Sequence, residues 1–286
     1  MPSSITQAFV SQWDNVIRMQ AQQKESRLEM AVTDRGSITG ESFTANRIAA
    51  VENTPQQLVR HGDTLWSDAA HTTRVALMLP YYQAIPIDRL DEPRVLANPA
   101  PVYDESMAAA WARRKDAQIF AALLGTAQNK DGTTSSLSGA QVIAAGGTGF
   151  TKAKIIQARK LFRKNEADAN TGETLYCCYN SEMMEDILSD TTLTSADFMA
   201  AKMLYEGDVK GKWLGVQWVP YEAITNSGGT YTTAMWTKTA LMKGTSGMFG
   251  SASRRADKQD LLQLSMGANF GAVRIEEEKV VSISFV

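Results

Sequence analysis

One alanine-rich stretch, from Pro99 to Gln128, constrains the fold more than any other part of the chain. Eight alanines lie between residues 108 and 127, and no glycine or proline interrupts them before Gly125. Alanine has the highest helix propensity, and glycine commonly ends a helix. Asp104 is a suitable N-cap because a carboxylate is favourable at the positive end of the helix dipole. We therefore expect one long helix over residues 104–125.

The two sides of this helix predict a structural element rather than a catalytic one. Apolar residues recur at spacings of three and four along one face. This face holds Met107, Ala110, Trp111, Ala117, Ala121 and Leu124, and the opposite side holds Arg113, Arg114, Lys115 and Asp116. Neither set has the residue types and spacing of a catalytic or ligand-binding site. We therefore expect a stiff supporting helix.

The composition of the 286 residues is that of a globular protein, with 44% hydrophobic and 21% charged residues. The formal net charge of -2 argues against a dedicated nucleic-acid binder, which would carry a basic patch or arm. We find neither a signal-peptide pattern nor a run of about eighteen apolar residues. The expectation is a soluble protein of one large or two moderate domains, made in a reducing cytoplasm.

Cys177 and Cys178 are the only cysteines. Adjacent residues in a strand point to opposite faces, so a disulfide between them would be strained. The favoured interpretation is two reduced thiols in a half-buried strand over residues 174–179. A vicinal redox switch is the alternative.

Residues 1–30 carry a sparse apolar stripe in an otherwise polar segment. The stripe consists of Ile5, Phe9, Trp13, Val16 and Ile17. It predicts an amphipathic helix with too narrow an apolar face to fold alone, so we expect it to pack on another surface of this chain or of a neighbour. Residues 31–50, with Gly36 and Gly40, predict a flexible connection.

Residues 51–90 contain short apolar stretches with partial alternation, separated by Gly62-Asp63 and by Pro80. This pattern predicts a long antiparallel β-hairpin. A two-stranded hairpin is only marginally stable by itself, so we expect it to find a partner. Two acidic clusters are expected to be solvated surface: Asp88, Asp91 and Glu92, and Glu276, Glu277 and Glu278.

The segment 126–151 is rich in glycine, serine and threonine and predicts a loop. Helices and strands then alternate over residues 151–245, which predicts a compact α+β unit. The expected helices are 152–166, 182–190 with Ser181 as its N-cap, and 195–206, and the expected strands are 174–179, 213–219 and 230–242. Three more strands are expected at 259–268, 270–276 and 280–286, with Gly267 and Gly271 as kinks or bulges.

The residues that usually carry catalysis or bind metals are scarce. His61 and His71, the only two histidines, fall in the expected hairpin near Asp63 and Asp68. A metal site there would need further ligands, so a solvated or interface role for both histidines is favoured. No Ser-His-Asp or Cys-His set and no G-x-S-x-G motif occurs.

The glycines from Gly146 to Gly149, followed by Lys152, do not have the spacing of a phosphate-binding loop. The basic residues of the helix at 152–166 are expected to face outward as an ordinary surface, with polyanion binding as the alternative. They are Lys152, Lys154, Arg159, Lys160, Arg163 and Lys164. The six tryptophans are scattered, which favours packing over a stacking platform. We therefore assign no catalytic, cofactor-binding or metal-binding residue, and no cofactor.

The order of these segments resembles the tailed-phage major capsid protein of the Hong Kong 97-type fold. The resemblance covers residues 50–286, and its order and spacing carry more weight than any single motif. The matching segments are Asp116-Ala-Gln-Ile119 through Leu124-Gly125; Ala153–Asn165, Leu175–Asn180 and Glu182–Leu188; Leu204–Gly207, Lys212–Val216 and Val219; and Asp257–Leu262, Gly271–Arg274 and Val280–Ile283.

The resemblance implies an α+β capsid fold. Its parts would be an N-terminal arm (1–50), an extended hairpin or E-loop (51–90), a peripheral P-domain (91–150, with the spine helix 104–125), an axial A-domain (151–245), P-domain strands (246–276) and a closing strand (277–286). It further implies self-assembly as pentamers and hexamers into an icosahedral virion shell around double-stranded DNA, formed in the host cytoplasm. The implied partners are a separate scaffolding protein and a portal, with a cement or decoration protein as an option, and no membrane.

One departure from the family pattern matters. Some relatives crosslink an E-loop lysine to a neighbouring asparagine, but this chain has no lysine between Lys24 and Lys115. The resemblance therefore implies a shell without that crosslink. The alternatives are an encapsulin-type nanocompartment shell, a ring-forming tail or adaptor protein, and an enzyme with an unrecognised site.

Overall fold

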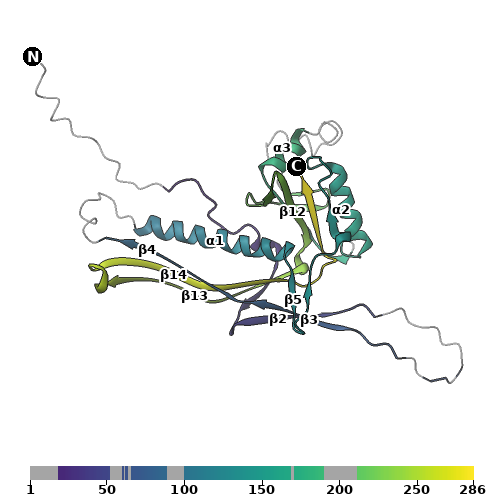
Figure 1. Ribbon diagram of the computed structural model, residues 1–286, viewed down its shortest axis with the longest axis horizontal. Helices are drawn as coiled ribbons and strands as arrows, with labels where there is room; N and C mark the ends of the chain where they lie inside the picture. The colour runs from purple at the N-terminus through teal and green to yellow at the C-terminus, as the bar shows by residue number, and fades with distance from the viewer. Residues whose placement is uncertain are drawn as a thin grey trace, which may run out of the picture. The chain divides into compact units, whose positions relative to one another are not determined.

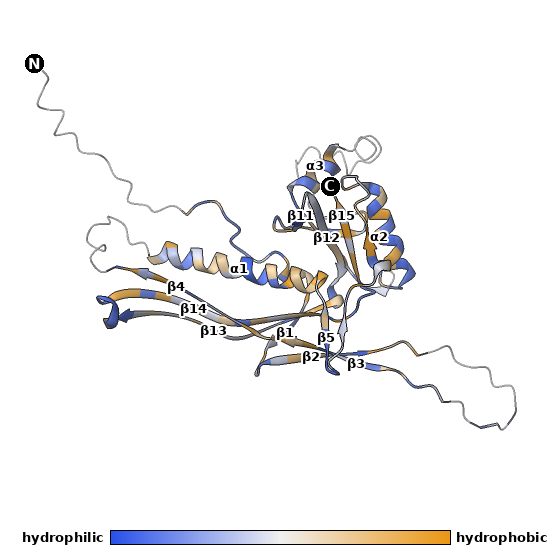
Figure 2. Ribbon diagram, in the orientation of Figure 1, coloured by the Kyte–Doolittle hydropathy of each residue, from blue (hydrophilic) through white to orange (hydrophobic). Residues whose placement is uncertain are grey.

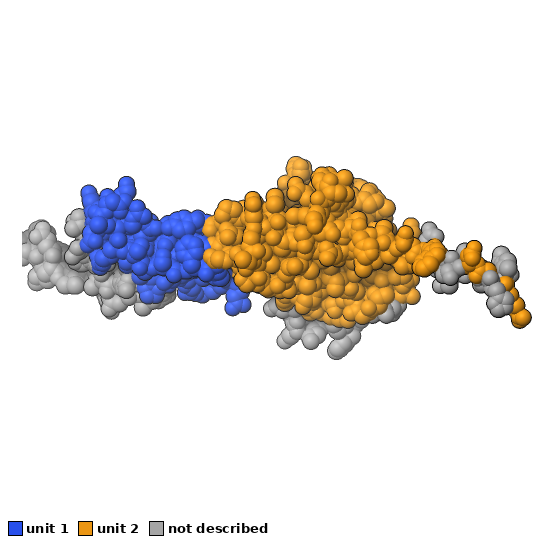
Figure 3. All heavy atoms as spheres, turned by 90° about the horizontal axis from the view of Figure 1, so that it is seen from below, with its two compact units in different colours: residues 1–25, 82–113, 248–267 blue, residues 26–81, 114–247, 268–286 orange. Residues whose placement is uncertain are grey.

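The computed structural model describes residues 19–51, 60, 62–63, 66–88, 100–168, 171–189 and 211–286 (Figure 1). The chain divides into two compact units, coloured separately in Figure 3. Unit 1 comprises residues 1–25, 82–113 and 248–267, and unit 2 comprises residues 26–81, 114–247 and 268–286. Several elements run from one unit into the other, so each unit is built from segments distant in sequence.

The long helix is confirmed as α1, Ala100–Leu124. It begins at Ala100, with Pro101 in its first turn, where the missing N–H of proline removes no helical hydrogen bond. Asp104 therefore lies inside the helix, and its expected N-cap role is wrong. Gly125 ends the helix as expected, since a Cβ at this position would lie 2.7 Å from the carbonyl oxygen of Ala121.

The predicted apolar face of α1 is only partly correct. Met107 and Trp111 are buried, but Ala121 is exposed, and Asp116, expected on the polar side, is fully buried. Near its C-terminal end, the helix instead buries larger side chains that lie among the alanines. These are Ile119, Phe120 and Leu123. Alanine contributes little apolar area, so the bulky residues decide which side of α1 faces the core.

Unit 1 contains the first part of α1 and parts of three long strands: β4 (Leu79–Ile87), β13 (Leu241–Arg255) and β14 (Leu261–Arg274). A small apolar cluster of Ile87, Met107 and Leu264 forms its core. A 3-10 turn at Ala256–Lys258 separates β13 from β14. Within the described residues this core is small, so unit 1 has little buried apolar surface of its own.

Strand β14 is one continuous strand, where two strands were expected at 259–268 and 270–276. Gly267 and Gly271 are not kinks, and close packing explains both glycines. A Cβ at Gly267 would come within 2.6 Å of the Phe249 ring, and one at Gly271 within 2.8 Å of the Leu77 carbonyl oxygen. Side chains at these positions would push neighbouring strands apart.

The main sheet of unit 2 has the strand order β7-β15-β12-β8-β10-β9, and β11 pairs with β12. Its strands are β7 (Val142–Ile143), β8 (Leu175–Tyr179), β9 (Lys212–Trp213), β10 (Val216–Pro220), β11 (Thr225–Ser227), β12 (Thr230–Thr237) and β15 (Val280–Phe285). Helices α2 (Lys152–Lys164) and α3 (Ser181–Ser189) lie beside this sheet in Figure 1. The expected helices at 152–166 and 182–190 and the strand at 174–179 are thereby confirmed.

Central strands of this sheet are buried along most of their length. Trp236, Met235 and Val281 are fully buried, as are both cysteines. Cys177 and Cys178 are free thiols, and burial raises the pKa of each well above its ordinary value. The favoured prediction of two reduced thiols is confirmed, although their strand is more deeply buried than the half-buried strand expected.

Several expected boundaries differ from the structure. The supposed connection at 31–50 contains two strands, β1 (Thr33–Ser37) and β2 (Ser42–Ile48), after a 3-10 turn at Glu29–Ala31. The expected strand at 213–219 is split into β9 and β10 by a turn in which Leu214 and Gly215 have positive φ. The expected strand at 230–242 ends at Thr237, before a 3-10 turn at Lys238–Ala240 and the start of β13.

Two further expectations concern helix positions. The N-cap of α3 is Asn180, whose side-chain oxygen accepts the Met183 N–H at 3.0 Å, and not Ser181. Residues 19–28, the end of the expected N-terminal helix, contain no helix. The rest of that helix and the expected helix at 195–206 lie outside the described residues.

The second sheet of unit 2 has the order β2-β3-β5-β6. Its other strands are β3 (His71–Leu77), β5 (Ala127–Asn129) and β6 (Thr134–Ser135). The hairpin predicted at 51–90 is therefore formed by β2 and β3 and begins before residue 51. The remaining expected hairpin segment, β4, belongs to the sheet β1-β13-β14-β4.

Candidate subunit-interaction surface

The hairpin of β2 and β3 is buried at its base. The two strands pair antiparallel from Ser42 opposite Leu77 to Ile48 opposite His71. Near the base, one face packs into an apolar cluster that also includes residues of β5 and β14. The cluster consists of Ile38, Phe43, Ala45, Ala76, Met78, Ala127 and Val273. This packing fixes the hairpin strands to the rest of unit 2.

Away from the base, the hairpin exposes large apolar side chains. Ile48 is 63% exposed, Val51 54% and Trp66 90%. Single exposed apolar residues are common, but several on one projecting segment indicate a surface that another molecule covers. Tryptophan is also enriched at the centres of protein interfaces. The distal hairpin is therefore the strongest candidate interaction surface among the described residues.

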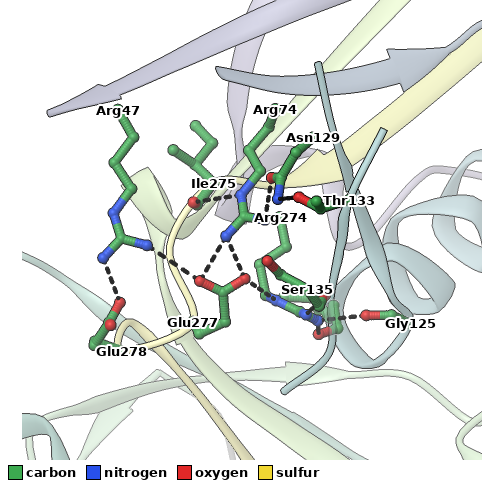
Figure 4. Close-up of polar contacts among 11 residues, drawn as sticks. Arg47, Arg74, Gly125, Asn129, Thr133, Ser135, Arg274, Ile275, Glu277 and Glu278 are labelled. Carbon is green, nitrogen blue, oxygen red and sulfur yellow. Dashed lines mark hydrogen bonds and ion pairs between the residues drawn. The ribbon is translucent and has the colours of Figure 1, made fainter. Parts of the chain in front are cut away.

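An ionic cluster lies at the hairpin base (Figure 4). Arg74, on β3, donates two hydrogen bonds to the Glu277 carboxylate, at 2.6 and 2.8 Å. Arg47, on β2, pairs with Glu277 at 3.2 Å and with Glu278 at 3.1 Å. Both strands of the hairpin are thus held to the turn that follows β14. The prediction that residues 276–278 form only solvated surface is wrong, because the side chain of Glu277 is 13% exposed.

A third arginine connects this cluster to the end of α1. Arg274 is fully buried and donates to the carbonyl oxygens of Leu123 at 2.7 Å, Gly125 at 2.6 Å and Ser135 at 3.0 Å. The last carbonyls of a helix lack partners within the helix, and a cation is favourable there. Burial lowers the pKa of Arg274, while nearby Glu277 opposes that effect. Arg274 therefore acts as the C-terminal cap of α1.

The cluster makes the hairpin base rigid. Removing one partner of a buried ion pair leaves an uncompensated charge, which typically costs about 3–5 kcal/mol. Here one carboxylate, that of Glu277, faces Arg47, Arg74 and Arg274, with the last at 3.8 Å. Displacing the hairpin would break several of these contacts together. The geometry is that of a structural anchor.

A further anchor fixes the segment that precedes β1. The buried carboxylate of Asp116 accepts hydrogen bonds from the Ser26 hydroxyl at 2.5 Å and from the backbone N–H groups of Arg27 at 2.9 Å and Leu28 at 3.2 Å. Sequence reasoning missed this contact because Asp116 sits among Arg113, Arg114 and Lys115. The only signal was an acidic residue at a position that helical spacing brings next to Ile119 and Phe120.

Among the described residues, those considered for metal or phosphate binding do not converge on a site. His71 is exposed on β3, and His61 lies outside the described residues. Among the described residues, no group of three or more His, Cys, Asp or Glu side chains is arranged to hold a metal ion. No described helix is both long and apolar enough to span a membrane.

Lys154 explains the glycine-rich segment before α2. Its ammonium donates to the carbonyl oxygens of Ala145 at 2.9 Å, Thr148 at 2.9 Å and Gly149 at 2.8 Å, and burial lowers its pKa. The segment therefore presents carbonyl oxygens to a cation, whereas a phosphate loop presents N–H groups. The expectation that Lys154 faces outward is wrong.

The fold defines a class of protein. It is the mixed α+β, Hong Kong 97-type fold of phage capsid subunits, and several solved structures share it. A structure from Mycobacterium phage Che8 is 17% identical, with a TM-score of 0.71 and 96% of each chain covered. The capsid of cyanophage P-SCSP1u is 15% identical, with a TM-score of 0.72, 100% of this chain and 95% of that chain covered. The capsid of cyanophage Pam1 is 11% identical, with a TM-score of 0.70 and coverages of 100% and 98%.

A family model described as phage capsid protein matches residues 5–286. The chain therefore belongs to the phage capsid protein family, as a major capsid protein of the tailed-phage type. Its role is structural, and its place is the capsid of the virion. No curated protein sequence matched the chain.

Proposed function

We propose that this capsid protein assembles as pentamers and hexamers into an icosahedral shell that encloses double-stranded DNA. The observation that carries the proposal is the hairpin with a rigid base and an exposed apolar distal part. Trp66, at 90% exposure, leaves a large apolar side chain in water unless another subunit covers it. The fold and family assign the chain to shells, and the hairpin supplies a surface for contacts between subunits.

The proposal assigns a capsid domain to each part of the chain. The β2–β3 hairpin would be the E-loop that lies over a neighbour, and α1 with β13 and β14 would form the peripheral P-domain. Residues 151–245, with α2, α3 and β8, would form the A-domain near the symmetry axes. The N-terminal arm would be the part of residues 1–50 that precedes β2. The closing strand is β15.

Contacts between subunits in this shell would be non-covalent at the hairpin. The segment between Lys24 and Lys115 has no lysine, so the hairpin offers no amine for an isopeptide bond. Support would come from apolar contacts such as those of Trp66, with a cement protein as a further contributor. A separate scaffolding protein and a portal are the other proposed partners, and assembly would take place in the host cytoplasm.

Electron microscopy of the purified full-length chain tests the shell, with and without co-expressed scaffolding protein. We expect closed particles of uniform diameter that contain pentameric and hexameric clusters. A chain that stays monomeric at every concentration and in both settings would rule out the shell. Rings or tubes without closure would favour a tail or adaptor role, and a native enzyme cargo inside closed particles would favour a nanocompartment.

A further inference from the structure

Helix α2 concentrates positive charge in a chain whose net charge is -2. Its thirteen residues include six basic side chains and no acidic one. Lys154 is buried, as described above, and the other five lie on the solvent side of the helix. These are Lys152, Arg159, Lys160, Arg163 and Lys164. Figure 2 shows the hydrophilic residues of α2 alternating with the hydrophobic residues that pack on the sheet.

Most of these charges have no counterion among the described residues. Arg163 pairs with Asp168 at 3.0 Å. Within the part of the chain that the structure describes, no carboxylate forms an ion pair with Arg159, Lys160 or Lys164. Like charges four positions apart, such as Lys160 and Lys164, destabilise a helix by about 0.2–0.5 kcal/mol per pair. The sequence of α2 is therefore better suited to a helix that meets an anionic surface than to one that faces only water.

Helix α3, in the same unit, has the opposite charge. Its nine residues include Glu182, Glu185 and Asp186 and no basic residue. Asp186 accepts the Phe150 N–H at 2.6 Å, so its carboxylate is occupied. Glu182 and Glu185 are exposed, form no ion pair with the described residues, and lie on one face of the helix because they are three positions apart.

We propose that the basic face of α2 binds the Glu182–Glu185 face of α3 on a neighbouring copy of this chain. The inference rests on the proposed shell. Subunits around a five-fold or six-fold axis meet head to tail, so each must present two different surfaces that complement each other. The α2 and α3 faces meet this requirement by charge, and each supplies the counterions that the other lacks.

A nucleic acid is the competing partner for α2, and the charges of unit 2 disfavour it. A polyanion would neutralise Lys160 and Lys164, but it would leave the exposed Glu182 and Glu185 without a counterion. Contact with a second copy satisfies both helices at once.

Charge-swap variants test the contact. One double variant reverses α2 (Lys160→Glu with Lys164→Glu), a second reverses α3 (Glu182→Lys with Glu185→Lys), and a quadruple variant combines them. A matched control, Lys212→Glu with Lys238→Glu, makes the same change in net charge at exposed positions outside α2. Circular dichroism and thermal melts of dissociated subunits verify folding. Shell yield is then measured by electron microscopy and light scattering at about 0.15 M salt.

We expect each double variant to lower shell yield at least about tenfold. The quadruple variant should regain most of it, and the control should assemble like the wild type. Normal assembly of both double variants, or no recovery in a folded quadruple variant, overturns the contact while wild-type shells uphold the proposed function. If the α2 variant assembles normally but retains less DNA, the partner is nucleic acid and the contact is overturned. Absence of wild-type shells overturns both proposals.

Discussion

The two sheets of unit 2 use apolar surface in different ways. The seven-stranded sheet buries its central strands on both faces, with Trp236, Met235 and Val281 fully enclosed. The hairpin sheet is enclosed only at its base, and beyond Ile48 it presents apolar side chains to solvent. The first sheet is complete within one subunit. The second leaves apolar side chains uncovered in the isolated subunit, so the stability of the subunit and its capacity to assemble can be tested separately.

Two tryptophans make this difference concrete. Trp236 has no exposed surface, and its indole N–H donates to the Ala31 carbonyl oxygen at 2.8 Å. Trp66 is 90% exposed. The same side chain therefore contributes to folding at one position and is available for binding at the other. Substituting each in turn should separate the two properties.

The largest effect on stability is expected from Trp236→Ala. Removing a large buried aromatic side chain costs about 3–5 kcal/mol because a cavity remains. Urea unfolding of dissociated subunits, followed by circular dichroism, measures the loss. A loss below about 1 kcal/mol would mean that the seven-stranded sheet is not the stability core of the subunit.

A somewhat smaller effect is expected at the hairpin base. Glu277→Gln leaves Arg74 without its carboxylate and should destabilise the subunit by about 3 kcal/mol. Glu278→Gln is the matched control, because the Glu278 side chain is 49% exposed and pairs with Arg47 alone among the described residues. The free energy of unfolding of the Glu278→Gln variant should differ from that of the wild type by no more than about 1 kcal/mol. Equal thermal shifts for the two variants would argue against a buried anchor at Glu277.

Alkaline pH provides a graded test of the enclosed sheet. Burial raises the pKa of Tyr221 to about 12, and it raises the pKa values of Cys177 and Cys178. Above about pH 9 the unfolded chain releases these protons while the folded chain retains them, so stability must fall as pH rises toward 12. Each group contributes a slope of up to about 1.4 kcal/mol per pH unit. Lys154 and Arg274, whose pKa values burial lowers, act in the opposite direction, but two groups do not cancel three.

Urea midpoints at several values from pH 8 to pH 11 measure this slope. Tyr221→Phe should reduce it, because the phenol no longer titrates. Thiol-reactive reagents should modify the two cysteines only after unfolding. Rapid modification of native subunits at neutral pH would contradict the burial of strand β8.

The smallest effect on stability is expected from Trp66→Ala. An exposed substitution usually changes the free energy of unfolding by no more than about 0.5 kcal/mol. Shell yield, by contrast, should drop sharply because the exposed apolar surface is reduced. Val142→Ala is a suitable control, since Val142 is a 45% exposed apolar residue outside the hairpin. If the Trp66→Ala variant forms normal shells, Trp66 is not part of the interaction surface.

Local patterns in the sequence predict much of this fold. Helices α1 and α2 and strand β8 follow from alanine content and from apolar spacing over short windows. Strand β1 was missed because a segment with Gly36 and Gly40 has the composition of a loop. Its pairing partner β13 lies about two hundred residues away, and such pairings leave no trace in local composition.

The anchoring residues are harder to predict, for a similar reason. Glu277 belongs to a run of three glutamates that has the pattern of solvated surface, and its partner Arg74 is 203 residues distant. Arg274 did carry a signal, because it lies between Val273 and Ile275 in a segment expected to form a strand. A lone arginine in such a segment indicates a buried partner, but it does not identify the carbonyls at the end of α1.

The position of Glu277 near the C-terminus has a consequence for biosynthesis. Arg47 and Arg74 leave the ribosome long before the carboxylate that neutralises them, since both ion pairs span more than two hundred residues. Until Glu277 has been synthesised, Arg47 and Arg74 at the hairpin base lack this carboxylate partner. The ion pairs that hold the hairpin base can therefore form only after Glu277 has been synthesised.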